Sequence, residues 1–360
     1  MRASGDGLTR GLQIGSELAD MIQRSVGFYH RYLDRRGVSS ERLQDLLTPY
    51  LVAAETAYPD MMNVLKGMSV GATVPVLEIF AINAFEELEP MLESPEGDLL
   101  FLQKKEGYLR KPSPERCSSL AVRTPSGSTL LAHNEHWLAG DVENVAVVVD
   151  APGDGRVPVA SPTVVCCLPA VGINAHGTAQ GIGSLTASDD GVGVPRVLVS
   201  RSALESRDRH DALARAAMPG RAGGYGHVFA FAGGDPIVLE TSGREHRSLE
   251  HAHPHTNHYQ SDLAAIAPPA SEGSQARLHR LEELLAQRPP EIVDDLMELM
   301  RDHDSSPQAI CLHPDEAEGD EASAVMFSMV CDADARRMWV APGNPCQHDY
   351  QEIALEGFVP

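Results

Sequence analysis

Residues 114–122, PERCSSLAV, mark the point at which the pattern of the sequence changes. Just before Cys117 lies KKEGYLRKPSPER, residues 104–116, whose charges, glycine and two prolines interrupt any regular element. Upstream of this segment the apolar residues recur every three or four positions, and downstream they alternate every second position. The sequence therefore predicts a helical N-terminal part and a strand-rich remainder, divided at Cys117.

The regular elements on either side follow from these two periods. Helices are expected in LQIGSELADMIQRSVGFYHRYL (12–33), LQDLLTPYLVAAETAYPDMMNVLKGM (43–68), PVLEIFAINAFEELEPML (75–92), SRSALESRDRHDALARAAM (200–218), ARLHRLEELLAQR (276–288) and EIVDDLMELMRDH (291–303). Strands are expected in SSLAVRT (118–124), STLLAHNEHW (128–137), ENVAVVVD (143–150), PTVVCCLPAVGIN (162–174), GHVFAFAGG (226–234), DPIVLET (235–241), SAVMFSMVCD (323–332) and RRMWVAPG (336–343). The strands form hairpin-sized groups and the helices cluster instead of alternating with them. This arrangement predicts a layered α+β fold and not a parallel doubly wound sheet.

The composition narrows the classes of partner. With 29 Lys and Arg against 51 Asp and Glu, the chain carries a net charge of -22 and would be repelled by nucleic acid and by anionic membranes. The start of the chain is polar and resembles no secretory signal, and no apolar run is long enough to span a bilayer. The six cysteines include no CxxC pair, which favours free thiols in the cytoplasm.

Cys117 is a candidate nucleophile on chemical grounds. Only a few per cent of an ordinary thiol is ionised at neutral pH, so a catalytic cysteine needs an adjacent base. A cut before Cys117 would supply one, because the new α-amino group could accept the thiol proton. Taken alone, however, a single cysteine is more often an inert, packed residue.

Two polar stretches lie near predicted strand ends. LLAHNEHW (130–137) brings together His133, Asn134, Glu135, His136 and Trp137, either as a site or as a polar strand end with a half-buried tryptophan.

HAHPHTNHY (251–259) is rich in histidine. In a strand His251, His253 and His255 would share one face and could bind a transition metal, although no cysteine or carboxylate completes the set. GxGxxG, GxxxxGK[ST] and GxSxG motifs are absent, so neither a nucleotide loop nor a serine hydrolase elbow is expected.

Four blocks, in order, resemble one family. They are CSSLAVRTPSGSTLLAHNEHW (117–137), PAVGINAHGTAQGIGSL (169–185), HTNHY (255–259) and VMFSMVCDADARRMWVAPGNPC (325–346). Together they resemble the cysteine N-terminal-nucleophile hydrolases related to isopenicillin-N (acyl-coenzyme A:6-aminopenicillanate) acyltransferase, a family that includes N-β-alanyldopamine hydrolase. MMNVLKGMSVGATVPVLEIFAINAFEEL (61–88) is similar to the helical propiece of that family.

The resemblance implies a four-layer αββα sandwich and a precursor that cleaves itself between Arg116 and Cys117. Residues 1–116 would stay bound as a helical subunit, and residues 117–360 would form the catalytic subunit. By the same resemblance, Cys117 is the nucleophile and Asn257 donates to the oxyanion. His136 takes the place of a family aspartate, and support comes from Asn134, Trp137 and Asn174. Neither a cofactor nor a catalytic metal is implied.

The chain also departs from the family. His136 in place of aspartate would make activity sensitive to pH near 6.5, the ordinary pKa of histidine. Arg116 stands where relatives carry glycine, and no arginine occurs between Arg301 and Arg336, where the family has one before its closing hairpin. A pocket for a neutral or cationic amide is therefore expected in preference to one for a carboxylate-bearing β-lactam or coenzyme A.

The sequence thus predicts an amidohydrolase or acyltransferase that acts on a small-molecule amide through an acyl-thioester. Its expected partners are this substrate and its own two cleaved pieces, as a heterodimer or within a larger homo-oligomer, without nucleic acid or membrane. Two alternatives stay open. The chain could be a non-catalytic relative that serves as a binding or structural protein, or a metal hydrolase built on the histidines of residues 251–258.

Overall fold

The N-terminal part of the chain is a bundle of helices in the computed structural model, which describes residues 1–92, 117–250, 254–355 and 358. Its helices are α1 (Gly7–Glu17), α2 (Ala19–Arg35), α3 (Ser40–Ala57), α4 (Pro59–Ala72), α5 (Val76–Asn83) and α6 (Phe85–Leu92). The three amphipathic stretches thus form six helices, because each stretch breaks near its middle, as at the turn before Pro59. The predicted boundary at 104–116 lies outside the described residues.

Helices α1 and α4 approach each other closely through glycines. A β-carbon at Gly11 would lie 2.0 Å from the Val64 carbonyl oxygen, and one at Gly67 would lie 2.3 Å from the Leu8 carbonyl oxygen. Only glycine leaves room for such backbone contact, which no larger residue permits without moving a helix. These glycines fix how the bundle packs.

The rest of the chain is built on two sheets. Within the described residues the larger sheet has eight strands in the spatial order β1 (Arg2–Gly5), β4 (Val145–Pro152), β5 (Val159–Val164), β6 (Gly172–Asn174), β7 (Thr178–Leu185), β8 (Gly224–Phe231), β9 (Ile237–Thr241) and β10 (His246–Glu250). The smaller sheet has five, in the order β13 (Gln351–Glu352), β12 (Arg337–Pro342), β11 (Ser323–Asp332), β3 (Thr129–Leu138) and β2 (Ser118–Arg123). All neighbouring strands are antiparallel except β1 and β4, which are parallel.

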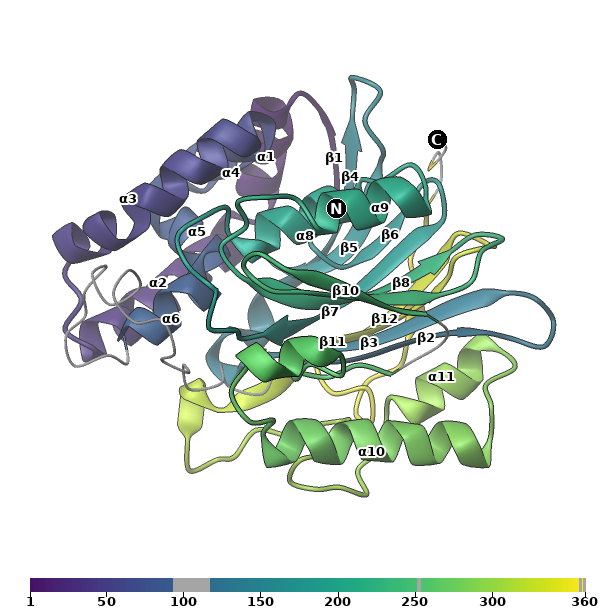
Figure 1. Cartoon of the computed structure of the whole chain (residues 1–360). Coiled ribbons are helices and arrows are strands. Elements are labelled where there is room, and N and C mark those ends of the chain that lie inside the picture. The colour runs from purple at the N-terminus through teal and green to yellow at the C-terminus, as the bar shows by residue number, and fades with distance from the viewer. Residues whose placement is uncertain (93–116, 251–253, 356–357, 359–360) are drawn as a thin grey trace.

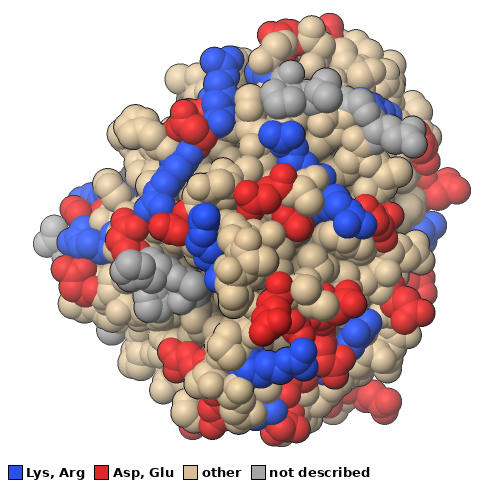
Figure 2. All heavy atoms as spheres, turned by 90° about the vertical axis from the view of Figure 1, so that its right-hand side faces the viewer, with Lys and Arg blue, Asp and Glu red and all other residues tan. Residues whose placement is uncertain are grey.

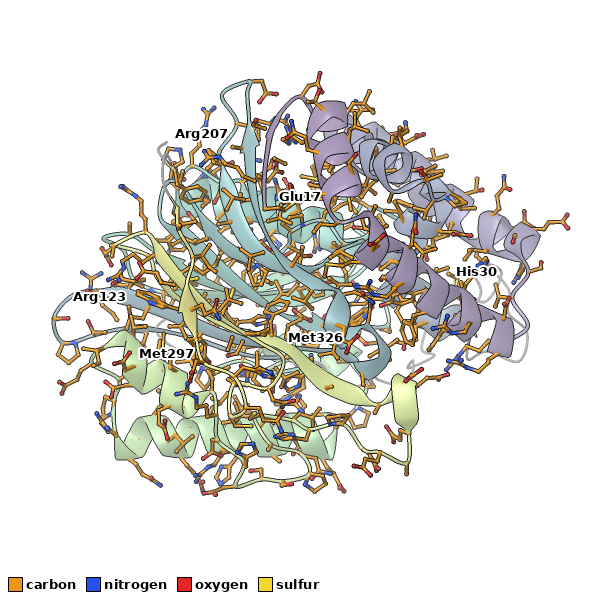
Figure 3. The ribbon with its side chains drawn as sticks, turned by 180° about the vertical axis from the view of Figure 1, so that it is seen from behind. Glu17, His30, Arg123, Arg207, Met297 and Met326 are labelled. Atoms are coloured by element: carbon orange, nitrogen blue, oxygen red, sulfur yellow. The ribbon has the colours of Figure 1, made fainter. Side chains whose placement is uncertain are left out.

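Helices cover the outer faces of both sheets (Figure 1). Helices α8 (Arg196–Leu204) and α9 (Arg209–Ala216) lie on the larger sheet, and α10 (Glu272–Gln287) and α11 (Val293–Leu299) lie on the smaller one. From behind, Met326 of β11 lies in the body of the molecule, whereas Met297 of α11 lies in the lower helix layer (Figure 3). Apolar clusters seal each helix–sheet contact, and the central cluster joins the N-terminal bundle to both sheets.

The α+β class predicted from the sequence is confirmed, and each of the eight predicted strand segments contains a strand. Four of the described strands escaped prediction, and one of them, β13, has only two residues. β1 lies in a stretch taken as helical, β7 has glycines in place of β-branched residues, and β10 has polar residues at alternating exposed positions. Since β1 pairs with β4, the N-terminus is also part of the larger sheet.

Charges of both signs cover the surface. On the face in Figure 2 basic and acidic side chains are intermixed, and the acidic ones gather toward its lower part, at the height of α10 and α11 in Figure 1. Among the described helices, none is both long and apolar enough to cross a bilayer.

Candidate active site

Cys117 stands immediately before β2, and its side chain points into the protein. The residue is 2% exposed, and Sγ donates to Oε1 of Glu135 at 3.2 Å. Glu135 belongs to β3, the partner of β2 in the hairpin that the sequence predicted. The backbone of Cys117 has a φ of 119°, in the region that residues with a β-carbon rarely adopt. Such strain is characteristic of functional sites, where the surroundings hold a residue in place.

A line of hydrogen bonds runs from the thiol into the interior. Glu135 Oε2 accepts from His133 Nε2 at 2.9 Å, and His133 Nδ1 lies 2.8 Å from Ser119 Oγ. With a neutral imidazole, Nε2 donates to the carboxylate and Nδ1 accepts from the hydroxyl. The opposite sheet leaves space for this network, because a β-carbon at Gly181 of β7 would lie only 3.0 Å from Ser119 Oγ. The glycine that weakened the strand prediction is therefore what admits the polar groups.

The surroundings keep the thiol protonated. Burial raises the pKa of Cys117 well above 9.0, and the negative charge of Glu135 raises it further. Glu86 acts in the same direction more weakly, while a hydrogen bond from the backbone of His136 opposes it. In the continuous chain Cys117 is thus a neutral thiol beside a carboxylate that can accept its proton.

A β-bulge lies beside this carboxylate. On β11 Val325 pairs with His136 and Phe327 pairs with Glu135, so that Met326 is an extra residue. A bulge bends the strand and turns its side chains relative to a regular ladder. Phe327 is thereby placed across from Glu135 at the edge of a cavity.

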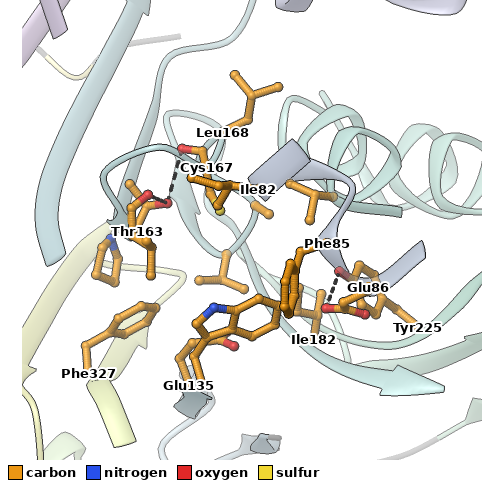
Figure 4. A pocket seen from close by; sticks show the side chains of 16 residues that line it. Ile82, Phe85, Glu86, Glu135, Thr163, Cys167, Leu168, Ile182, Tyr225 and Phe327 are labelled. Atoms are coloured by element: carbon orange, nitrogen blue, oxygen red, sulfur yellow. Dashed lines mark hydrogen bonds between the residues drawn. The ribbon is translucent and has the colours of Figure 1, made fainter. Parts of the chain in front are cut away.

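The cavity begins at Glu135 and extends between the sheets toward the N-terminal bundle (Figure 4). It measures about 70 Å³, enough for several waters or a small acyl group. Its wall is mostly apolar and is formed by Ile82, Phe85, Glu86, Glu135, Trp137, Pro162, Thr163, Val164, Cys167, Leu168, Ala170, Val171, Ile182, Val197, Tyr225 and Phe327. Residues of the N-terminal helices and residues that follow Cys117 thus enclose one cavity.

Glu86 forms a polar edge of the cavity. Its Oε1 accepts a hydrogen bond from the Tyr225 hydroxyl at 3.0 Å (Figure 4), and its Oε2 lies 3.5 Å from Nη1 of Arg196. Arg196 is buried and also pairs with Glu87 at 2.8 Å and Asp190 at 3.7 Å. This guanidinium is therefore neutralised by three carboxylates, and the helix that carries Glu86 and Glu87 is bound to the sheet core.

A short antiparallel bridge between Ser119 and His255 brings the segment with Asn257 beside the start of β2. Ser119 of β2 pairs with His255 in antiparallel fashion, with both backbone hydrogen bonds made, at 2.9 and 2.8 Å. Continued by two residues, this register leads from Asn257 to Cys117. Arg277 of α10 closes the link, donating to Asn257 Oδ1 at 2.9 Å and to Ser118 Oγ at 3.2 Å. The Asn257 amide nitrogen donates to the Ser184 carbonyl at 3.4 Å and also borders a small pocket.

His136 and Asn134 face the other side of β3. Their side chains contact the loop after α11, with His136 Nε2 at 3.2 Å from the Ile310 carbonyl and Asn134 Nδ2 at 3.0 Å from the Met300 carbonyl. Burial lowers the pKa of His136 well below 6.5, and Arg277 lowers it further. The titration near pH 6.5 expected from the sequence is therefore wrong for this environment. Only the backbone of His136 faces the thiol, and the side chain beside Cys117 is Glu135.

Two of the predicted supporting residues have distinct places. Trp137 lines the cavity, packs edge-on against Phe85 at 5.7 Å and donates from its ring to the Tyr29 hydroxyl. Asn174 is buried away from the thiol. Its amide donates to the carbonyls of Leu204 and Ser206, which ties the turn after β6 to the end of α8.

The histidine-rich stretch is only partly described, because His251 and His253 lie outside the described residues. Arg116, on the other side of the expected cut, lies outside them as well. His255 is buried and its Nε2 lies 3.0 Å from Glu240 Oε1, so this imidazole is bound to a carboxylate of β9.

Sequence reasoning named His133 and Glu135 only as members of the polar stretch 130–137, without a role in the site, and did not name Arg277. The alternation of β3 could have identified the first two, since residues 133, 135 and 137 share one face of a strand. No comparable signal marks Arg277, which lies on a helix 159 positions after Ser118 in the chain. The ligand atoms of Cys117, His133 and Glu135 lie within 4.8 Å of one another, so this set could also hold a metal ion.

The chain matches no family model and no curated protein. Among solved structures it is similar to penicillin V acylase from Agrobacterium tumefaciens, with 9% identity and a TM-score of 0.43, covering 67% of this chain and 86% of that chain.

Proposed function

We propose that the chain is a self-processing cysteine hydrolase or acyltransferase of the N-terminal-nucleophile type, acting on a small-molecule amide through a Cys117 thioester. The observation that carries the proposal is the 3.2 Å contact between the Cys117 thiol and Glu135, at the edge of an apolar cavity. The resemblance of the four sequence blocks supports it independently. Under this proposal the layers of helices and sheets form the αββα sandwich of that type, and 1–116 and 117–360 are its two subunits.

Self-cleavage would use the carboxylate as the base. Glu135 takes the proton of the Cys117 thiol, and the sulfur attacks the carbonyl carbon of Arg116. The bond from that carbon to the Cys117 nitrogen breaks, the nitrogen takes a proton, and a thioester forms. Water then releases the carboxyl end of residues 1–116 and frees both the thiol and a new α-amino group. The positive φ of Cys117 would favour this step, because cleavage relieves the strain.

Turnover would repeat this chemistry on an external amide. The free amine of Cys117 accepts the thiol proton, the sulfur attacks the substrate carbonyl, and an amine leaves. Asn257 would stabilise the oxyanion if its side-chain NH2 group turned from the Ser184 carbonyl, to which it makes a long hydrogen bond of 3.4 Å, toward the reacting oxygen. Water or an acceptor amine then removes the acyl group. His136 acts through its backbone in this scheme, by its hydrogen bond toward the sulfur.

The charges of the cavity favour a neutral or cationic amide with an apolar acyl group. Its polar members include the carboxylates of Glu86 and Glu135, and the nearby Arg196 is already paired with three acids. An anionic substrate would meet these carboxylates with no free cation among the described cavity residues. Acidic coenzyme A thioesters are disfavoured for the same reason.

Intact mass and N-terminal sequencing test the proposal. The purified chain of 38.8 kDa should yield two pieces of about 13 and 26 kDa, in proportion to their lengths, and the larger piece should begin Cys-Ser-Ser-Leu-Ala. Both pieces should elute together, since Ile82, Phe85 and Glu86 complete the cavity. A chain that stays intact and neither cleaves nor binds an amide would favour the non-catalytic alternative. An intact chain with full activity would show that the α-amino group is not the base.

A further inference from the structure

A second group of sulfur and nitrogen atoms lies on the far side of the smaller sheet from the thiol site. His303, Cys311 and His313 come from the segment between α11 and β11, and Cys346 comes from the segment between β12 and β13. One ligand atom from each residue lies within 4.8 Å of the other three. Cys311 is buried, and the other three are exposed, so the group is open to solvent on one side.

The distances resemble those of a tetrahedral metal site. His303 Nε2 and His313 Nε2 are 3.0 Å apart, and Cys346 Sγ is 3.3 Å from the same His313 nitrogen. In a tetrahedral zinc site the ligand atoms are about 3.3 Å apart for two nitrogens and about 3.5 Å for nitrogen and sulfur, given bonds of about 2.0 and 2.3 Å. Only small movements of exposed side chains are needed to reach this geometry.

Hydrogen bonds join the two segments that carry these residues. Arg301 Nε donates to the Pro345 carbonyl at 2.8 Å, and the Cys311 amide donates to the Asp302 carbonyl at 3.0 Å. Asn344 donates to the Leu312 carbonyl at 2.8 Å and to Cys311 Sγ at 3.4 Å. A hydrogen bond of this kind from an outer residue orients a thiolate ligand and stabilises its charge. These contacts hold the backbone near Cys311 beside the backbone near Cys346.

We propose that His303, Cys311, His313 and Cys346 form a structural zinc site. Thiolate and imidazole ligands together select zinc over magnesium or calcium, which prefer oxygen. Four protein ligands fill a tetrahedral coordination sphere, so the ion has no open position for substrate, as in structural sites. Two thiolates also neutralise the charge of the ion.

The ion would clamp the loop that supports β3. The carbonyl oxygens of Met300 and Ile310 accept from Asn134, and that of Ile310 also accepts from His136. Asn134 and His136 flank Glu135 on β3. Zinc would thus hold the loop carrying Cys311 to the segment carrying Cys346 and stabilise the strand behind the thiol site. The proposal does not depend on what reaction, if any, Cys117 performs.

Metal analysis of the full chain tests the site. Protein purified under reducing conditions without chelator should contain about one zinc per chain. After removal of the metal, Co²⁺ should produce a thiolate charge-transfer band and the visible bands of tetrahedral cobalt. His303→Ala and Cys346→Ser change exposed residues and should leave the fold intact by circular dichroism. Each should weaken zinc binding by more than the roughly 10- to 100-fold that an outer-shell residue contributes.

Two controls locate the ion. His279→Ala removes an exposed histidine of α10 that pairs with Glu283 and should leave zinc content unchanged. Cys117→Ala should also retain zinc. Loss of zinc in that variant alone would place the ion at Cys117, His133 and Glu135 and overturn the proposal. It would equally be overturned by wild-type protein that binds no more zinc than Cys346→Ser, or by a Cys311–Cys346 disulfide that persists under reducing conditions in place of zinc.

Discussion

The two clusters of cysteine and histidine have similar atoms and opposite surroundings. Cys117 and His133 are buried and share the carboxylate of Glu135, and Glu135 itself lines an apolar cavity. In the other cluster two thiols and two imidazoles come from loops, and three of the four residues are exposed.

This difference shows how the same elements acquire different chemistry. A carboxylate beside one buried thiol raises its pKa and provides a proton acceptor, which suits a nucleophile that must be activated at the moment of reaction. Two thiols and two imidazoles that face solvent on one side suit a cation, because the ion displaces the thiol protons and accepts a lone pair from each of the four ligand atoms.

The largest effect should come from replacing the nucleophile. Cys117→Ala should abolish both self-cleavage and turnover, because it removes the thiol that donates to the Glu135 carboxylate. Intact mass measures the first and amide hydrolysis the second. Cys331→Ala serves as the control, since this buried thiol of β11 lies within the apolar core. Cleavage in Cys117→Ala would assign the chemistry elsewhere and remove the basis of the comparison.

The next effect should come from the carboxylate. Glu135→Gln keeps the size of the side chain but cannot accept the thiol proton, so self-cleavage should slow by roughly 10²- to 10⁴-fold. The same change removes a charge that raises the pKa of Cys117, so that pKa should fall. Time courses of intact mass and of alkylation separate the two effects. Glu143→Gln, at an exposed position, is the matched control. Normal cleavage in Glu135→Gln would mean that the carboxylate only packs against the thiol.

A smaller loss is expected at the oxyanion donor. Asn257→Asp keeps an oxygen for Arg277 but loses the amide donor, and should lower kcat by roughly 10²- to 10³-fold with little change in KM. His258→Ala, whose imidazole contacts Ser274 Oγ, should lose far less. Steady-state kinetics on any cleaved amide provide the measurement. Near-normal kcat in Asn257→Asp would exclude Asn257 from the mechanism.

The smallest effect is a difference in pH and metal dependence of alkylation. Because thiolate is the reactive form and the pKa of Cys117 lies well above 9.0, its labelling in the uncleaved chain should rise about tenfold per pH unit, without a plateau up to pH 9. After cleavage a positive α-amino group lowers this pKa, so the plateau should move to lower pH. A chelator should expose Cys346 to iodoacetamide and leave Cys117 labelling unchanged. Peptide mass spectrometry measures the labelling of Cys117 and of Cys346 separately. Labelling of Cys346 that does not change with chelator would contradict its role as a ligand.

Local patterns explain what the sequence predicted well. The change of period at Cys117, the hairpin from Ser118 to Leu138 and the amphipathic helices are properties of neighbouring residues, which propensity and alternation encode directly. Strand β7 (Thr178–Leu185) was not predicted, because its glycines carry no strand signal of their own and its stability depends on packing against Ser119 and His133.

The sequence by itself determined that Cys117 opens a strand after a helical part, and that His133 and Glu135 share a face of the next strand opposite to His136. The tertiary structure alone decided which face meets the thiol, since that depends on how the two sheets and α10 pack. It also decided that His303, Cys311, His313 and Cys346 converge, because contacts such as that of Arg301 with Pro345 bring distant loops together. Alternation along a strand is fixed by covalent geometry. Convergence of loops is fixed only by the packing of the whole chain.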